Sequence, residues 1–236
     1  RPEPTACIGT PNSQLSEEFE HFLGPRADLA FEDGVGLVQK RGQFMQQAVP
    51  LGVGAMAAII GLEDDQISAA CLESSLDQCV VAVNYNSPGQ VVIAGHAEAV
   101  DRAMQACKDR GAKRAMPLAV SAPFHTPLMR PAGEQLGLEL AKISINSPNV
   151  PVVHNVHAQF EAEPEKIKQL LVDQISSPVQ WTQCVQQMRS SGVDVTIECG
   201  PGNVLSGLSR RIDKSIQSYG LEQPQKMIDA IEALEI

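Results

Sequence analysis

The sequence predicts an α/β protein, because strand-like and helix-like segments alternate along most of its 236 residues. Short apolar runs such as 54–60 and 79–84 are typical of strands, while longer segments repeat their apolar residues at helical spacing. Between residues 54 and 120 the expected order is β-α-β-β-α-β, which is the ferredoxin-like arrangement. Elsewhere strands and helices alternate singly, which indicates a mostly parallel sheet covered on both faces.

The first predicted element of this fold is a helix over 31–48. Residues 1–28 lack a clear core pattern, and we expect a loose extension or a poorly anchored helix there. In the helix 31–48 the apolar residues share one broad face, and Arg41 lies near its middle, where a charge is costly unless paired. Two interpretations remain open. The guanidinium either reaches the helix edge or an internal carboxylate, or it binds the carboxylate or phosphate of a ligand.

The β-α-β-β-α-β unit follows directly, and each of its elements has its own signal. The expected elements are a strand at 54–60, a helix at 63–76, strands at 79–84 and 90–94, a helix at 97–110 and a strand at 113–120. The two middle strands form a hairpin, because residues 84–89 are rich in Asn, Ser, Pro and Gly. Gly111 ends the second helix.

The last strand of this unit leads to a turn that carries His125. Thr126 suits the N-cap of the next helix, expected over 128–143, and Pro127 suits its first position. An imidazole at such a turn can accept and return a proton near neutral pH. The remaining expected elements are a strand at 150–153, helices at 164–175 and 181–190, a strand at 193–198, a helix at 204–212, a polar link at 213–224 and a helix to 236.

Composition excludes several classes of function. The net charge is −10 and the pI about 4.9, so a nucleic-acid partner is not expected. No apolar run is long enough for a membrane span. None of the six cysteines forms a C-x-x-C pair, and we read them as buried thiols of a reducing compartment. Without a recognisable signal peptide, we expect a cytoplasmic protein or one of an organelle matrix. His154 and His157 lack an acidic third ligand, so no metal site is expected.

Six segments carry a resemblance to a known family, at 38–50, 54–61, 84–95, 120–125, 177–181 and 198–208. They include Lys40-Arg41-Gly-Gln, Asn84-Tyr-Asn-Ser-Pro-Gly-Gln, Ala122-Pro-Phe-His125 and Cys199-Gly-Pro-Gly202. In their order and spacing they resemble the bacterial-type malonyl-CoA:acyl carrier protein transacylases, from about residue 28 to the end of the sequence.

The resemblance implies an architecture and an activity. It implies an α/β-hydrolase-like large subdomain, N-terminally incomplete here, made of residues 29–51 and 125–236. A ferredoxin-like subdomain, 52–124, is inserted in it, and residues 1–28 are an unmatched extension. The active site lies in a cleft between the subdomains. A malonyl group passes from malonyl-CoA to the thiol of acyl carrier protein through a seryl-enzyme, in fatty-acid biosynthesis. The coenzyme A thioester is a substrate, and no cofactor is implied.

The resemblance also assigns roles to four residues. His125 matches the histidine that activates the serine and protonates the leaving thiolate. Arg41 matches the arginine that binds the malonyl carboxylate. Gln180 matches the glutamine whose backbone carbonyl orients the imidazole. Asn86 matches a polar residue that faces the cleft, although it could instead simply form the hairpin turn.

One part of the family pattern is missing from the sequence. The family has a nucleophile elbow, G-x-S-x-G, before the helix that carries Arg41, and an N-terminal loop that helps to form the oxyanion hole. No serine of this chain lies in G-x-S-x-G. The chain could be a fragment of a longer enzyme, it could be completed by a second chain, or it could be a non-catalytic module that binds acyl carrier protein or acyl-CoA. We favour the first explanation.

Overall fold

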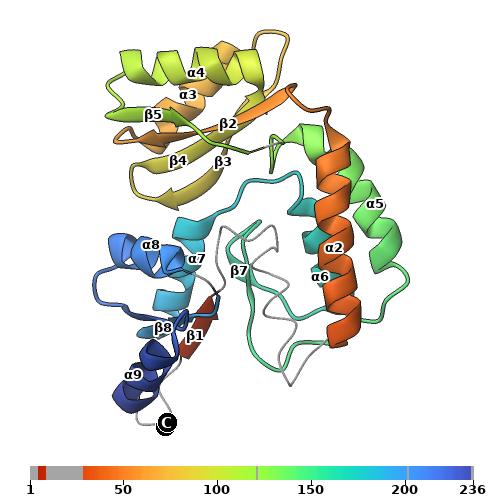
Figure 1. Cartoon of the computed structure of the whole chain (residues 1–236), viewed down its shortest axis with the longest axis vertical. Coiled ribbons are helices and arrows are strands. Elements are labelled where there is room, and N and C mark those ends of the chain that lie inside the picture. Colours follow the sequence, from red (N-terminus) through yellow and green to blue (C-terminus); the bar gives the residue numbers. More distant parts are fainter. Residues whose placement is uncertain (1–4, 9–28, 121, 201, 235–236) are drawn as a thin grey trace.

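The computed structural model describes residues 5–8, 29–120, 122–200 and 202–234. Its elements form a four-stranded sheet with two helices, a group of helices around the long helix α2, and a three-stranded sheet with its own helices (Figure 1). Strands and helices are mixed along the chain, as an α/β fold requires. In the described part of the chain, no helix is both long and apolar enough to cross a membrane.

The four-stranded sheet contains the β-α-β-β-α-β unit. Its elements are β2 (Gly54–Ile60), α3 (Asp64–Ser75), β3 (Val80–Ser87), β4 (Gln90–His96), α4 (Ala97–Asp109) and β5 (Arg114–Pro117). The strand order is β3-β4-β2-β5, and every neighbouring pair is antiparallel. The two helices lie together on one face of the sheet (Figure 1). Strand β5 is shorter than the expected 113–120, because only residues 114–117 pair with β2.

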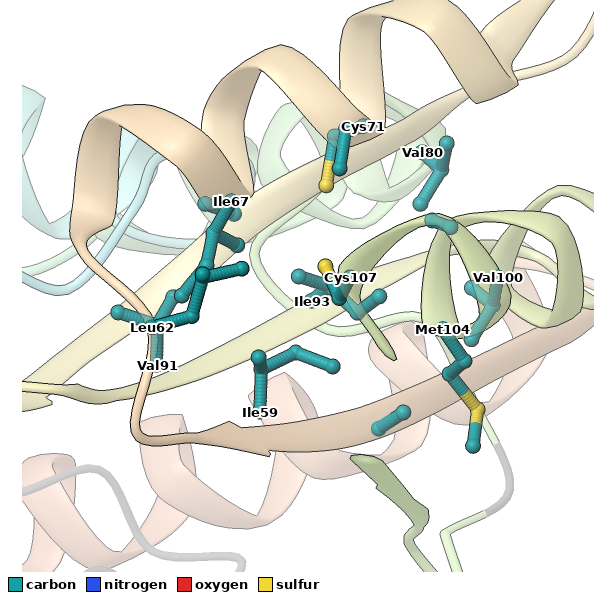
Figure 2. Packing of buried hydrophobic residues seen from close by; sticks show 14 of the residues in the cluster. Ile59, Leu62, Ile67, Cys71, Val80, Val91, Ile93, Val100, Met104 and Cys107 are labelled. Atoms are coloured by element: carbon teal, nitrogen blue, oxygen red, sulfur yellow. The ribbon is translucent and has the colours of Figure 1, made fainter. Parts of the chain in front are cut away.

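A compact apolar core lies between this sheet and its two helices. Figure 2 shows Ile59 and Ile93 of the sheet directed towards Cys71 of α3 and Cys107 of α4. Burial raises the pKa of the Cys71 thiol to about 12, so this thiol stays protonated and acts as a small apolar group. At the end of β4, Gly95 is required because a Cβ there would lie 2.0 Å from the carbonyl oxygen of Cys79.

The second core lies among the helices that follow and precede this sheet in the chain. The elements are α2 (Phe31–Ala48), the short helix η1 (Pro127–Met129), α5 (Arg130–Leu140) and α6 (Pro164–Asp173). Buried leucines, isoleucines and methionines of α2, α5 and α6 form one cluster, which includes Leu37, Met45, Leu136, Leu140, Ile167 and Leu171. Helices α2 and α5 run side by side (Figure 1).

The three-stranded sheet is parallel and differs in two places from the sequence prediction. Its order is β1 (Thr5–Ile8), β8 (Val195–Glu198), β9 (Gln217–Gly220). Residues 5–8 were expected to be part of a loose extension, and β9 lies in the segment expected to be a polar link. Both predictions are wrong. The composition of these short segments does not indicate a strand, and they become strands because they pair with β8. The rest of the expected extension, residues 1–4 and 9–28, lies outside the described residues.

Helices α7 (Trp181–Ser190), α8 (Val204–Ile212) and α9 (Pro224–Leu234) complete this part. The carboxylate of Glu198, fully buried at the end of β8, accepts the backbone N–H groups of Leu205 and Ser206. An anion at the start of a helix satisfies amide groups that have no partner within the helix. The strand expected at 150–153 is reduced to β6 (Val153–His154), which pairs antiparallel with β7 (Gln159–Phe160).

Candidate functional site

His125 lies in a tight turn between β5 and η1 and has an unusual backbone conformation. Its φ is 62°, in the left-handed region that residues other than glycine adopt uncommonly, although asparagine, aspartate and histidine do so more often than the rest. The hydroxyl of Thr126, which is fully buried, donates to the carbonyl oxygen of Pro123 at 2.7 Å and closes the turn. Thr126 occupies the N-cap position and Pro127 the first helical position, but the Thr126 hydroxyl does not cap a helix amide. Strain of this kind persists where surrounding contacts fix a side chain in place.

The imidazole of His125 is oriented by a backbone carbonyl. Its Nδ1 lies 2.9 Å from the carbonyl oxygen of Gln174, the residue that ends α6. A carbonyl oxygen can only accept, so Nδ1 carries the proton and Nε2 keeps a lone pair. The last carbonyl groups of a helix have no partner within it, which leaves the Gln174 carbonyl available for this bond. The arrangement gives the chain a neutral imidazole that can accept a proton at Nε2.

Arg41 reaches the same residue from α2. Its Nη2 donates to the side-chain Oε1 of Gln174 at 2.7 Å. The Arg41 residue is only 5% exposed, so its guanidinium does not reach solvent at the helix edge, and its hydrogen bond to Gln174 is made to a neutral amide. Gln174, also buried, therefore contacts Arg41 through its side chain and His125 through its backbone. A guanidinium in this position is suited to bind a carboxylate, with which it can form two parallel hydrogen bonds.

The electrostatics of this pair favour the neutral imidazole. Burial of the ring, followed by the positive charge of Arg41, lowers the pKa of His125 to about 4. The backbone groups of Gln174 and Ser177 act in the opposite direction but are outweighed. At neutral pH His125 is therefore uncharged and its Nε2 is ready to act as a base.

The structure corrects the expectation for Gln180. This residue was expected to orient the imidazole with its backbone carbonyl, but that carbonyl accepts the N–H of Cys184 as the first bond of α7. Gln174 takes the orienting position instead. The two glutamines stand six residues apart in one loop region, and their shared residue type does not tell which carbonyl faces the ring. One indication for Gln174 is that it follows the last residue of an amphipathic helix, where backbone carbonyl groups have no partner within the helix.

Asn86 is not joined to this group of residues. It lies near the end of β3, and no hydrogen bond between described residues links its side chain to Arg41, His125 or Gln174. Its expected role in facing a cleft stays a prediction. Among the described residues no group of three or more His, Cys, Asp or Glu side chains is arranged to hold a metal ion. His154 is fully buried, with its ring edge-on to that of His157 at 6.1 Å between centroids.

Comparison with known proteins defines the class first. The family model for the acyl transferase domain matches residues 23–223. The chain is 54% identical over 218 residues to the malonyl CoA-acyl carrier protein transacylase of Escherichia coli K12, and the matched region covers 90% of this chain and 71% of that protein. The chain therefore belongs to the malonyl-CoA:acyl carrier protein transacylase family of acyl transferases, which confirms the family expected from the sequence motifs.

Solved structures agree with this membership. The crystal structure of the malonyl-CoA:acyl carrier protein transacylase from Xanthomonas oryzae has a TM-score of 0.91 and 47% identity, over 97% of this chain and 71% of that one. The structure of the enzyme from Coxiella burnetii has a TM-score of 0.89 and 44% identity, and the match covers 92% of this chain and 69% of that one. A malonyl-transacylase in complex with a type II PKS acyl-carrier protein has a TM-score of 0.85 and 46% identity, and the match covers 87% of this chain and 66% of that one. These neighbours confirm the predicted α/β fold class.

Proposed function

We propose that this chain provides the acid–base and carboxylate-binding part of a malonyl-CoA:acyl carrier protein transacylase. The reaction moves a malonyl group from the coenzyme A thioester to the thiol of acyl carrier protein, in fatty-acid biosynthesis. The observation that carries the proposal is the link from Arg41 through Gln174 to His125, which puts a carboxylate-binding cation beside an oriented proton acceptor. The names of the relatives support the choice of substrates.

In this proposal each residue has a defined role. In the first half-reaction Nε2 of His125 takes the proton of the attacking serine hydroxyl and gives it to the departing coenzyme A thiolate; in the second it takes the proton of the attacking carrier-protein thiol and returns it to the departing serine oxygen. Arg41 binds the free carboxylate of the malonyl group and so disfavours acyl groups without one. Asn86 is kept as a candidate for contact with the substrate. No serine of this chain lies in G-x-S-x-G, so the reaction requires a serine elbow from sequence outside these 236 residues.

The proposal also covers the organisation of the protein and its surroundings. We place a ferredoxin-like subdomain at 52–124, between two parts of a large subdomain at 29–51 and 125–236. The strand order β3-β4-β2-β5 supports the boundaries of the insert. Malonyl-CoA and acyl carrier protein are the partners, no cofactor takes part, and the cytoplasm is the location. The acidic surface, with a net charge of −10, argues against a nucleic-acid partner.

Binding calorimetry with malonyl-CoA and acetyl-CoA tests the carboxylate-binding role without requiring catalysis. We expect the chain to prefer malonyl-CoA, and we expect Arg41→Ala to reduce that preference at least tenfold, since one buried charged hydrogen bond is worth about 1.5–3 kcal/mol. Arg130→Ala, at an exposed position, is the matched control. Equal affinity of the unaltered chain for both thioesters would contradict the proposal.

A second candidate function is a non-catalytic module that binds acyl carrier protein or acyl-CoA. The absence of a serine in G-x-S-x-G favours it. Incubation with isotope-labelled malonyl-CoA, followed by intact-mass measurement, separates the candidates. A covalent malonyl adduct that His125→Asn abolishes would show that a nucleophile is present and would exclude the non-catalytic module. Binding of malonyl-CoA without an adduct would support it.

A further inference from the structure

The side chain of Gln174 is neutral at every pH, whereas its partner Arg41 is always charged and its partner His125 can take up a proton. Its Oε1 accepts from Nη2 of Arg41 at 2.7 Å, and its backbone oxygen accepts from Nδ1 of His125 at 2.9 Å. A glutamate of the same shape would also satisfy the guanidinium, and would do so with an ion pair. That ion pair would compete with any carboxylate brought by a ligand. A neutral amide instead offers a hydrogen bond of correct geometry and leaves the charge of Arg41 unchanged.

We propose that the neutral side chain of Gln174 occupies the guanidinium of Arg41 until a ligand carboxylate displaces it. Gln174 thereby couples carboxylate binding to the basicity of the His125 imidazole. The proposal rests on the proposed function, in that the ligand carboxylate is that of a malonyl group. It assigns Gln174 the part of a positioning residue that acts through Arg41 and His125. The substrate class it selects is a dicarboxylic acyl thioester with one free carboxylate.

The chemistry of the amide suits an exchange of this kind. When a carboxylate takes the guanidinium, the amide oxygen loses its donor, but rotation about the last side-chain bond presents the NH₂ group instead. The same residue then donates a hydrogen bond to the bound carboxylate. Neither a glutamate nor an apolar side chain can change from acceptor to donor in this way. The backbone carbonyl does not need to move, so the His125 imidazole keeps its orientation.

The coupling has an electrostatic basis in the charges that face His125. From α2, the Arg41 guanidinium lowers the pKa of the imidazole, second only to burial. From the end of α6 and the loop after it, the backbone groups of Gln174 and Ser177 raise it. Among the described residues, Arg41 supplies the charge that perturbs this ring. A carboxylate bound to Arg41 compensates that charge, so the imidazole becomes a stronger base when the correct substrate is present.

Nuclear magnetic resonance titration of the His125 ring protons tests the coupling directly. The signal is assigned with His125→Asn, and free malonate serves as the probe. For the unaltered chain we expect saturating malonate to raise the pKa of His125 by about one unit, and we expect Arg41→Ala to abolish the response. Binding of malonate to the unaltered chain with no change in the His125 pKa would overturn the proposal while leaving the proposed function standing.

Two substitutions at Gln174 separate its charge from its shape. Gln174→Glu should raise the His125 pKa without malonate and should weaken malonate binding at least tenfold. Gln174→Met keeps the backbone carbonyl, so it should leave the pKa unchanged but weaken malonate binding a few-fold, because Arg41 is no longer held in place. Gln39→Glu, on the exposed face of α2, is the matched control and should change neither quantity.

The outcomes distinguish this proposal from the proposed function. Binding of neither malonate nor malonyl-CoA by the unaltered chain would refute the malonyl-binding role and, with it, this proposal, because no carboxylate would then displace Gln174; binding without a change in the His125 pKa would refute this proposal alone. An unchanged pKa in folded Gln174→Glu would overturn the coupling. Should Gln174→Glu fail to fold, the malonate titration of the unaltered chain still decides the question, because it needs no variant at this position.

Discussion

Acidification should destabilise this protein through His125. The pKa of the imidazole is about 4 in the folded chain, against 6.5 for the free side chain. Because the folded value is the lower one, the unfolded chain binds more protons between these two values. The stability contributed by neutral His125 is therefore complete above pH 6.5 and is lost as the pH falls towards 4.

The size of this loss follows from the two pKa values. A difference of this magnitude corresponds to about 3 kcal/mol at 1.36 kcal/mol per pKa unit. The His125 residue is partly rather than fully covered, so we expect about 2 kcal/mol between pH 8 and pH 4.5. For a domain of ordinary stability this is a substantial fraction of the total free energy of unfolding.

Urea unfolding at pH 8 and pH 4.5 isolates the contribution when the unaltered chain is compared with His125→Asn. Asparagine tolerates the left-handed backbone at φ 62°, and its amide can still donate to the Gln174 carbonyl. Carboxylates whose pKa is lowered in the folded chain, such as Glu161, contribute equally to both proteins and cancel in the comparison. We expect the unaltered chain to lose about 2 kcal/mol more than the variant. Equal losses would refute the assignment of a buried, neutral imidazole.

Three further substitutions, two of them paired with a control substitution, test packing and hydrogen bonding at the site and elsewhere in the fold. Thr126→Val removes a fully buried hydroxyl and should cost about 1–2 kcal/mol in urea unfolding, whereas Thr126→Ser keeps the hydrogen bond and most of the stability. Gly95→Ala would bring a Cβ to 2.0 Å from the carbonyl oxygen of Cys79 and should cost more than about 3 kcal/mol, while Gly42→Ala in α2 meets nothing within 4 Å and should stabilise the chain by about 0.5–1 kcal/mol. Glu198→Ala leaves two amides at the start of α8 without their acceptor and should cost about 2 kcal/mol; an unchanged unfolding midpoint would count against that role.

Much of this fold could be predicted where local pattern and packing agree. The helix expected at 31–48 is α2, because its apolar spacing matches the face that packs on α5 and α6. The same pattern singled out Arg41 as a charge on an apolar face, and the residue is indeed buried. Strands β2, β3 and β4 of the four-stranded sheet could be predicted because each has an apolar run that packs against α3 or α4.

The remainder depends on contacts between distant parts of the chain. Strands β1 and β9 are short, and their sequences Thr-Ala-Cys-Ile and Gln-Ser-Tyr-Gly acquire strand geometry by pairing with β8. The choice of Gln174 over Gln180 depends on a backbone carbonyl, and every residue carries one, so residue type gives no indication of which oxygen meets the ring. The sequence identifies His125 as the candidate base, but the carbonyl oxygen that contacts its ring is determined by the path of the chain after α6.

That path also ties the site to the four-stranded sheet. Five residues after Gln174, the backbone of Val179 donates to β3 at 2.7 Å and accepts from Tyr85 at 3.0 Å, and the Thr182 hydroxyl donates to the Tyr85 carbonyl at 2.9 Å. On the other side of the imidazole, Phe124 packs against both the core around α2 and the sheet residues that face it. His125 is thus held from two directions, and both constraints depend on how the sheet lies against the helices. A displacement of the sheet would move the Gln174 carbonyl and the Phe124 backbone together, and with them the contact to Arg41. The placement of the four-stranded sheet is therefore part of what sets the geometry of the imidazole and the guanidinium, although neither residue belongs to it.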